Sequence, residues 1–146
     1  MVMTTRFASS RRRPLGVSVL AILLLAIGLF AFTGSLWMWG AGFLFSFPAG
    51  TDYAFPVADI LVNAPASIIA AVGLWRMKQW GYGASQFVAG FYTYASVEIF
   101  VMVIQEGAPY PLKIIVPQLA AILVAAILVF YLWRIRSLFG FRQRDS

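Results

Sequence analysis

Six polar side chains lie within long apolar stretches of this chain, and they could carry chemistry there. In chain order they are Thr33, Asp59, Asn63, Tyr94, Glu98 and Gln118. A carboxylate in the hydrocarbon of a membrane costs about 2–3 kcal/mol on insertion scales, so it should face a bundle interior or a cavity. Two interpretations stay open. The residues form either a small outward-facing polar pocket or ion site centred on Glu98, or interhelical hydrogen bonds that hold a bundle together.

Counting along the expected helices predicts that several of these residues share one depth. At a rise of about 1.5 Å per residue, a level about 10 Å below the outer boundary is reached by Thr33, Asn63, Glu98 and Gln118. Asp59 lies one turn nearer the outside, and Tyr94 lies one turn deeper than Glu98. We therefore expect one polar layer in the outer third of the bilayer.

Two residue types that dominate catalytic and metal sites are missing. The chain contains no Cys and no His. This composition excludes disulfides, thiol chemistry and Cys-ligated metal clusters, and it removes the usual general base and haem ligand. We predict no enzyme activity, no catalytic residue, no metal site and no cofactor.

The elements that would position the polar layer are transmembrane helices. Of 146 residues, 62% are hydrophobic and only 11% are charged, less than half the charged share of an ordinary soluble domain. About 20 apolar residues suffice to cross the hydrocarbon. We predict an all-α, four-helix transmembrane bundle in a single domain over residues 1–146, with spans at about 15–39, 55–75, 82–105 and 111–133.

The middle of the chain contains a polar break between the second and third predicted spans. It runs from Gly73 to Gly83 and carries two basic residues between tryptophans. Its glycines are expected to permit a tight reversal. Pro65, within the second predicted span, is expected to free a backbone carbonyl and kink the helix.

Basic residues predict how the chain is oriented. The N-terminal segment, the central turn and the C-terminal segment carry four, two and four Lys or Arg, whereas the two expected outer loops carry only Lys113. Such an asymmetry predicts that both termini are cytoplasmic. A topogenic role, or contact with anionic lipid headgroups, is expected for Arg11, Arg12, Arg13, Arg76, Lys78, Arg134 and Arg136.

Three boundary segments carry a resemblance. They are Arg13-Pro14-Leu15-Gly16, the stretch from Gly73 to Trp80, and Arg136-Ser137-Leu138-Phe139-Gly140. With them the chain resembles a loose class of small prokaryotic four-helix integral membrane proteins of unknown function. The resemblance implies a multi-pass protein of the cytoplasmic membrane, and it implies no activity and no site residues.

The expected function follows from this placement. We expect a non-catalytic accessory or structural subunit of a larger membrane complex, or a self-associating protein, because its apolar helices offer lipid- or helix-facing surface on every side. The alternative is a small transporter or channel subunit that uses the polar layer around Glu98. The expected partners are the lipid bilayer and other membrane subunits or further copies of the chain. Nucleic acid is not expected, because the basic residues lie at the ends of apolar runs.

Overall fold

The protein is entirely helical over the residues that the structure describes. A computed structural model describes residues 13–40, 57–106 and 111–140, and these contain no strand. The long helices are α1 (Leu15–Gly40), α3 (Ala64–Trp75), α4 (Gln79–Glu106) and α5 (Pro111–Arg134). A π-helical segment, η2 (Asp59–Asn63), leads directly into α3, and a 3-10 helix, η3 (Arg136–Phe139), follows α5. The prediction of an all-α fold is confirmed.

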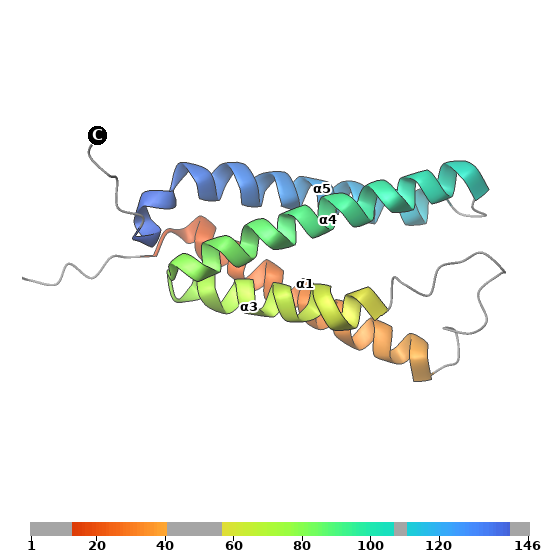
Figure 1. The fold of residues 1–146 in the computed structure, drawn as a ribbon, viewed down its shortest axis with the longest axis horizontal. Coiled ribbons are helices and arrows are strands. Elements are labelled where there is room, and N and C mark those ends of the chain that lie inside the picture. Colours follow the sequence, from red (N-terminus) through yellow and green to blue (C-terminus); the bar gives the residue numbers. More distant parts are fainter. Residues whose placement is uncertain (1–12, 41–56, 107–110, 141–146) are drawn as a thin grey trace, which may run out of the picture.

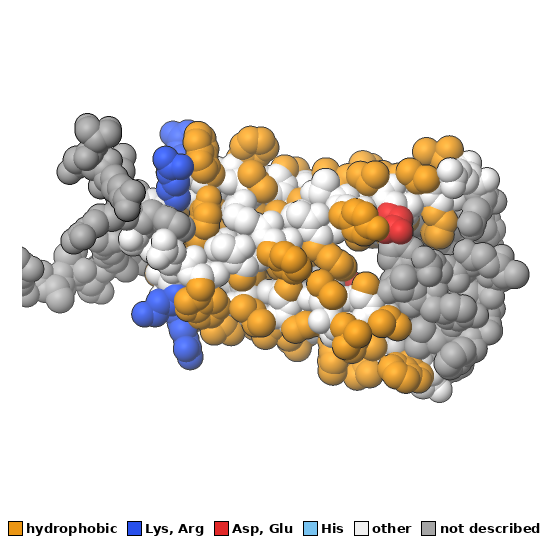
Figure 2. All heavy atoms as spheres, viewed as in Figure 1, with side chains coloured by type: hydrophobic (Ala, Val, Ile, Leu, Met, Phe, Trp, Pro, Cys, Tyr) orange, Lys and Arg blue, Asp and Glu red, His pale blue; other side chains and the backbone are white. Residues whose placement is uncertain are grey.

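Three of these helices are long and apolar enough to cross a membrane. They are α1, α4 and α5, whereas η2 and α3 together form a shorter apolar helix from Asp59 to Trp75. Large hydrophobic side chains such as Leu61 and Phe130 are exposed, and hydrophobic side chains cover much of the face shown in Figure 2. The described Lys and Arg side chains gather at one end of the molecule (Figure 2), which we call the basic end.

The helices pack in chain order. α1 lies against α3, α3 against α4, and α4 against α5 (Figure 1). The first and last helices approach at the basic end, where the ring of Tyr131 on α5 covers Gly16 on α1 so closely that a Cβ there would collide with it. From that contact α1 and α5 diverge along the bundle (Figure 1). The bundle is thus closed at the basic end and opens toward the other.

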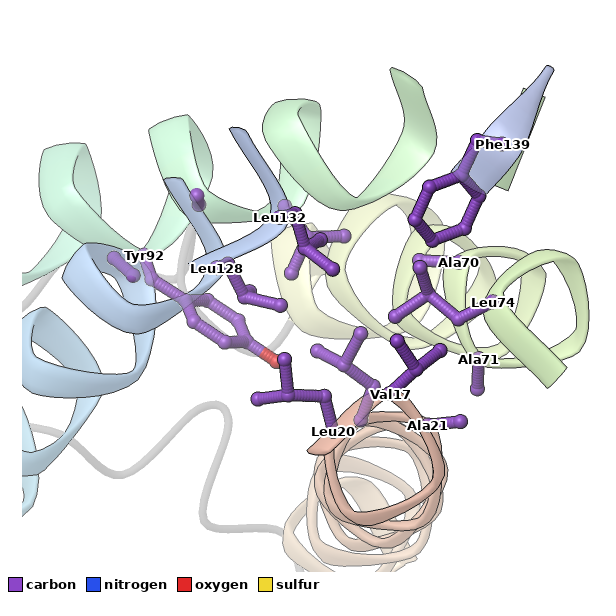
Figure 3. Packing of buried hydrophobic residues seen from close by; sticks show 14 residues of the cluster. Val17, Leu20, Ala21, Ala70, Ala71, Leu74, Tyr92, Leu128, Leu132 and Phe139 are labelled. Atoms are coloured by element: carbon purple, nitrogen blue, oxygen red, sulfur yellow. The ribbon is translucent and has the colours of Figure 1, made fainter. Parts of the chain in front are cut away.

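The hydrophobic core lies in the closed half. Figure 3 shows buried side chains converging from all four long helices and from Phe139 of η3. Leu24, Leu74, Leu128 and Leu132 are fully buried. Each such side chain contributes roughly 1.5–3 kcal/mol in water, but between lipid-embedded helices close packing replaces much of that term. The core therefore holds the helices together where they are closest.

The turn between α3 and α4 differs from its prediction. It spans only three residues, Arg76 to Lys78, and α4 begins at Gln79, earlier than the expected residue 82. The left-handed residue is Met77, with φ 52°, and no glycine takes that role. Its N–H donates to Leu74 O (3.0 Å) and the Lys78 N–H donates to Gly73 O (2.9 Å), which is the Schellman pattern of helix ends.

The glycines of this segment serve helix contact instead. Gly73 in α3 and Gly81 in α4 face each other so closely that a Cβ on either would collide with the backbone of the other. Only glycine lacks the atom that would push the two backbones apart. The glycines thus permit the tight reversal by letting the two helices of the hairpin approach, while Met77 takes the left-handed conformation in the turn.

The interruption expected at Pro65 appears as a π-helical turn. η2 ends at Asn63, and Pro65 lies in the first turn of α3, where its missing N–H is tolerated. A proline ring within a continuous α-helix would clash with the carbonyl four residues earlier. The wider π turn over Asp59–Asn63 directly precedes this first turn of α3.

Candidate functional site

A cavity of about 1000 Å³ lies in the half of the bundle away from the basic end. It is bordered by α1, by η2 with the residue before it, by α4 and by α5. It occupies the region where α1 and α5 have diverged. Most of its described lining is apolar or aromatic, and its polar side chains are Thr33, Ser35, Asp59, Asn63, Tyr92, Ser96 and Gln118.

A chain of hydrogen bonds runs along one side of this cavity. The Asn63 amide Nδ2 donates to Asp59 Oδ1 (2.8 Å), and the Ser67 hydroxyl donates to Asn63 Oδ1 (3.0 Å). Ser67 Oγ also lies 3.0 Å from the Tyr92 hydroxyl on α4. The first three residues are spaced four apart, which places them on one face of the helix. These hydrogen bonds thus connect Asp59 at the cavity to Tyr92 on α4.

The direction of these bonds follows from the number of hydrogens. Ser67 has one hydroxyl hydrogen and gives it to Asn63, so the hydrogen between Ser67 and Tyr92 comes from Tyr92. Every donor in the chain therefore points toward Asp59. Such an arrangement ends on a hydrogen-bond acceptor, the Oδ1 atom of the Asp59 carboxyl group.

A second polar contact joins α4 to α5. The buried Ser96 hydroxyl lies within bonding distance of Gln118 Oε1 (3.2 Å) and of the Gln118 backbone carbonyl (3.3 Å). Deeper along the same interface, Gln86 Nε2 donates to Leu128 O (3.2 Å). Interhelical bonds of this kind contribute about 0.6–2 kcal/mol each in a membrane. They fix the rotation of α4 and α5 and so shape the cavity wall.

Four of the six predicted site residues line the cavity together. Asp59, Asn63, Thr33 and Gln118 all do so, as the polar layer predicted. The Thr33 hydroxyl bonds to its own helix, at Leu29 O (2.8 Å), so it is partly occupied there. These four residues therefore share one cavity, and the hydrogen bonds on its wall involve Asn63 and Gln118.

Glu98 and Tyr94 are not among the residues that line the cavity. α4 contributes Tyr92 and Ser96 to the wall, and Glu98 follows Ser96 by two residues. Phe91 also lines the cavity, and Glu98 comes seven residues after it, so Glu98 lies at the edge of the cavity-facing side of α4. Tyr94 is turned further from that side and is 65% exposed. Depth along the helix is similar, but the rotation about its axis differs, and Glu98 is not the centre of the pocket.

Three residues of the site were missed by the sequence interpretation: Ser67, Tyr92 and Ser96. The signal was their spacing. Asp59, Asn63 and Ser67 repeat every four residues, and so do Tyr92 and Ser96, which predicts a polar stripe on each helix. A serine among alanines is also typical of a small residue at a helix contact. For this reason the spacing was not interpreted as a polar stripe.

The cavity's chemistry is limited by its lining. Asp59 is the one acidic side chain among the described lining residues, and none of them is Lys or Arg. The described part of the chain holds no group of three or more Asp, Glu, His or Cys that could bind a metal ion. The site can bind and orient a ligand through one carboxylate, a tyrosine hydroxyl and amides, in a wall that is otherwise apolar.

The predicted basic residues occupy the end opposite the cavity. Arg13 is placed by specific contacts: Nη1 donates to Trp75 O (2.8 Å), and Cζ lies 3.7 Å from the centroid of the Trp75 ring. It thereby satisfies a terminal carbonyl of α3. Arg136 lies over Trp133, with Cζ at 5.4 Å. Arg11 and Arg12 lie outside the described residues.

Comparison with known proteins gave no guide to this site. Neither the known protein families nor the curated proteins nor the solved structures gave a match. The likeness to small prokaryotic four-helix membrane proteins therefore stays a prediction, and the functional argument rests on the site itself.

Proposed function

We propose that the chain is a multi-pass protein of a prokaryotic cytoplasmic membrane, with η2 and α3 as a fourth span beside α1, α4 and α5. The gathering of Lys and Arg at the basic end supports cytoplasmic termini under the positive-inside rule (Figure 2). Because the chain has no Cys, single cysteines introduced at the two ends would report sidedness by labelling with a membrane-impermeant maleimide. Labelling of the basic end in intact cells would contradict this orientation.

Within that membrane we propose a non-catalytic subunit that associates with other membrane-embedded helices, either of another polypeptide or of further copies of this chain. The observation that carries the proposal is Glu98. It is half-buried on α4, outside the cavity and near the exposed Val97 and Val101. Within the described ranges no hydrogen bond or ion pair involves its carboxylate.

Such a position is costly in lipid and favourable in an assembly. Glu98 lies eight residues before the end of α4 at Glu106, about 12 Å along the axis. An intramembrane carboxylate ordinarily faces a bundle interior or a polar partner, and among the described residues no side chain bonds to Glu98. A neighbouring transmembrane helix with a donor at the same depth would satisfy it.

The test measures assembly and its dependence on Glu98. Tagged protein is extracted in mild detergent, and its mass is measured by light scattering and native mass spectrometry. We expect the wild type as an oligomer or with a stoichiometric partner, and Glu98→Leu as a single chain. Asp59→Asn, which alters the carboxylate inside the cavity, is the matched control and should assemble normally. A monodisperse wild-type monomer would contradict the proposal.

A second candidate function, a small transporter or channel subunit, is favoured by the cavity itself. In that case Asp59 and Gln118 would form the polar layer, in place of Glu98. Proteoliposomes would be tested for sodium and potassium flux with the wild type and with Asp59→Asn. Flux that is lost in the variant would support this function, and absence of flux in the wild type would contradict an ion channel.

A further inference from the structure

The cavity has the features of a site for one class of ligand. Aromatic side chains Phe30, Trp37, Phe91 and Tyr92 contribute to its wall, and Asp59 brings a carboxylate. A volume of about 1000 Å³ lies at the upper end of the range of small-molecule pockets. Such pockets combine an apolar wall with a few convergent polar groups that orient the ligand.

The Asp59 carboxyl group is held as a hydrogen-bond acceptor at one oxygen. The donors from Tyr92, Ser67 and Asn63 point in sequence toward Asp59 Oδ1. Among the described residues, the hydrogen bonds of Asp59 reach only this oxygen, and no basic side chain lines the cavity. A carboxylate with one partly compensated oxygen in an apolar wall favours a positively charged ligand.

The type of cation follows from what surrounds Asp59. An inorganic ion such as Ca²⁺ or Mg²⁺ requires six or more oxygen ligands, and the described residues contain no acidic cluster that would supply them. Aromatic faces, by contrast, attract organic cations. We propose that the cavity between α1 and α5 binds a lipophilic organic cation, with the positive centre at Asp59 and the apolar body against the aromatic wall.

This inference goes beyond the proposed function. It rests on the membrane placement proposed above and depends neither on assembly through Glu98 nor on transport. A ligand of this class dissolves in the bilayer and reaches the cavity where α1 and α5 diverge (Figure 1). Asp59 and Glu98 are therefore expected to separate in function, the first in ligand binding and the second in association.

The experiment uses two probes of nearly the same shape and opposite charge. The full chain in nanodiscs of zwitterionic lipid is titrated with tetraphenylphosphonium and, separately, with tetraphenylborate, and empty nanodiscs correct for partitioning. We expect saturable binding of tetraphenylphosphonium at one site per chain and no saturable binding of tetraphenylborate. Equal saturable binding of both ions, or no saturable binding of the cation, would overturn the proposal.

Variants then locate the site. Asp59→Asn, which nearly conserves the shape, should weaken the cation at least tenfold, whereas Glu98→Gln should bind within twofold of the wild type. Wild-type affinity in Asp59→Asn, or equal losses in both variants, would overturn the assignment to the cavity. The comparison of the two probes on the wild type stays decisive if Asp59→Asn fails to fold. Assembly is read separately by mass, so failure of the Glu98 proposal is distinguishable from failure of this one.

Discussion

At the basic end, the helices approach until backbone meets backbone, whereas in the other half the same helices separate around a cavity. Gly73 against Gly81 and Gly16 beneath Tyr131 leave no room for an added Cβ. At the opposite end, Asp59 and Gln118 line a space of about 1000 Å³. The bundle thus combines tightly packed helix contacts at one end with a cavity at the other.

The two ends of the bundle differ in what holds their helices together. Small residues let helices associate by van der Waals packing in a membrane, and Gly16, Gly73 and Gly81 make such contacts at the closed end. The open half keeps its shape through a few hydrogen bonds, from Asn63 to Tyr92 and from Ser96 to Gln118. Substitutions at the closed end should therefore cost more stability than substitutions in the cavity wall.

The largest effect is expected for Gly81→Val. Its Cβ would collide with the backbone of Gly73, and the two helices would have to separate. We expect a loss of about 3 kcal/mol or more, seen as a fall of about 10 °C in Tm in detergent. Gly90→Val is the matched control on the same helix, because a Cβ there meets nothing within 4 Å. Equal Tm values for the two variants would show that the closed end is not tightly packed.

A smaller loss is expected for Met77→Ile in the turn. Met77 has φ 52°, a region that β-branched residues strongly disfavour. The substitution should lower the free energy of unfolding by about 1–2 kcal/mol. Met77→Leu has a similar volume and no branch at Cβ, so it should cost less. Chemical denaturation of both variants tests this, and a costlier Leu variant would point to packing in place of backbone conformation.

Next in size is Arg13→Lys. Lysine keeps the positive charge that orients the chain but lacks the planar group that covers Trp75 and donates to its carbonyl. We expect a loss of about 1 kcal/mol with unchanged membrane orientation. Arg134→Lys is the control, because the described residues show no such contact for Arg134. A change of orientation with unchanged stability would make Arg13 purely topogenic.

The smallest loss of stability is expected for the hydrogen bonds beside the cavity. Ser67→Ala removes the link between Asn63 and Tyr92. In a double-mutant cycle with Tyr92→Phe we expect a coupling energy of about 0.6 kcal/mol, and at most about 2. Thermal unfolding of the four proteins measures it. A coupling of zero would mean that the two hydroxyls do not interact.

The sequence predicted the helices well and their rotation poorly. Apolar runs bounded by Pro14 and Pro111 define the starts of α1 and α5, and the bounds agree with those expected. Apolar residues surround α1 and α4 almost evenly, so no amphipathic stripe reveals which face packs inward. The sequence therefore indicated that Asn63 and Gln118 lie at one level of the bundle, where both line the cavity, but it carried no signal for the rotation of α4 that keeps Glu98 out of the lining.

Two local features could not be placed in detail from the sequence. The glycine-rich segment indicated a tight reversal but not which residues make it: Met77 is the left-handed residue, and Gly73 and Gly81 make the helix contact. Arg13 was interpreted from its charge alone. Its contact with Trp75, 62 residues away, depends on tertiary placement, which no local pattern contains.

The measurement that tests the central claim most directly is the separation of α1 and α5 along the bundle. Because the chain has no Cys, spin labels can be placed at exposed positions without a background. One pair, Val19 with Phe130, reports on the closed end, and the other, Phe32 with Val116, reports on the cavity half. Double electron–electron resonance in nanodiscs should give a clearly longer distance for the second pair. Equal distances would mean that α1 and α5 run side by side throughout, and would contradict the open site.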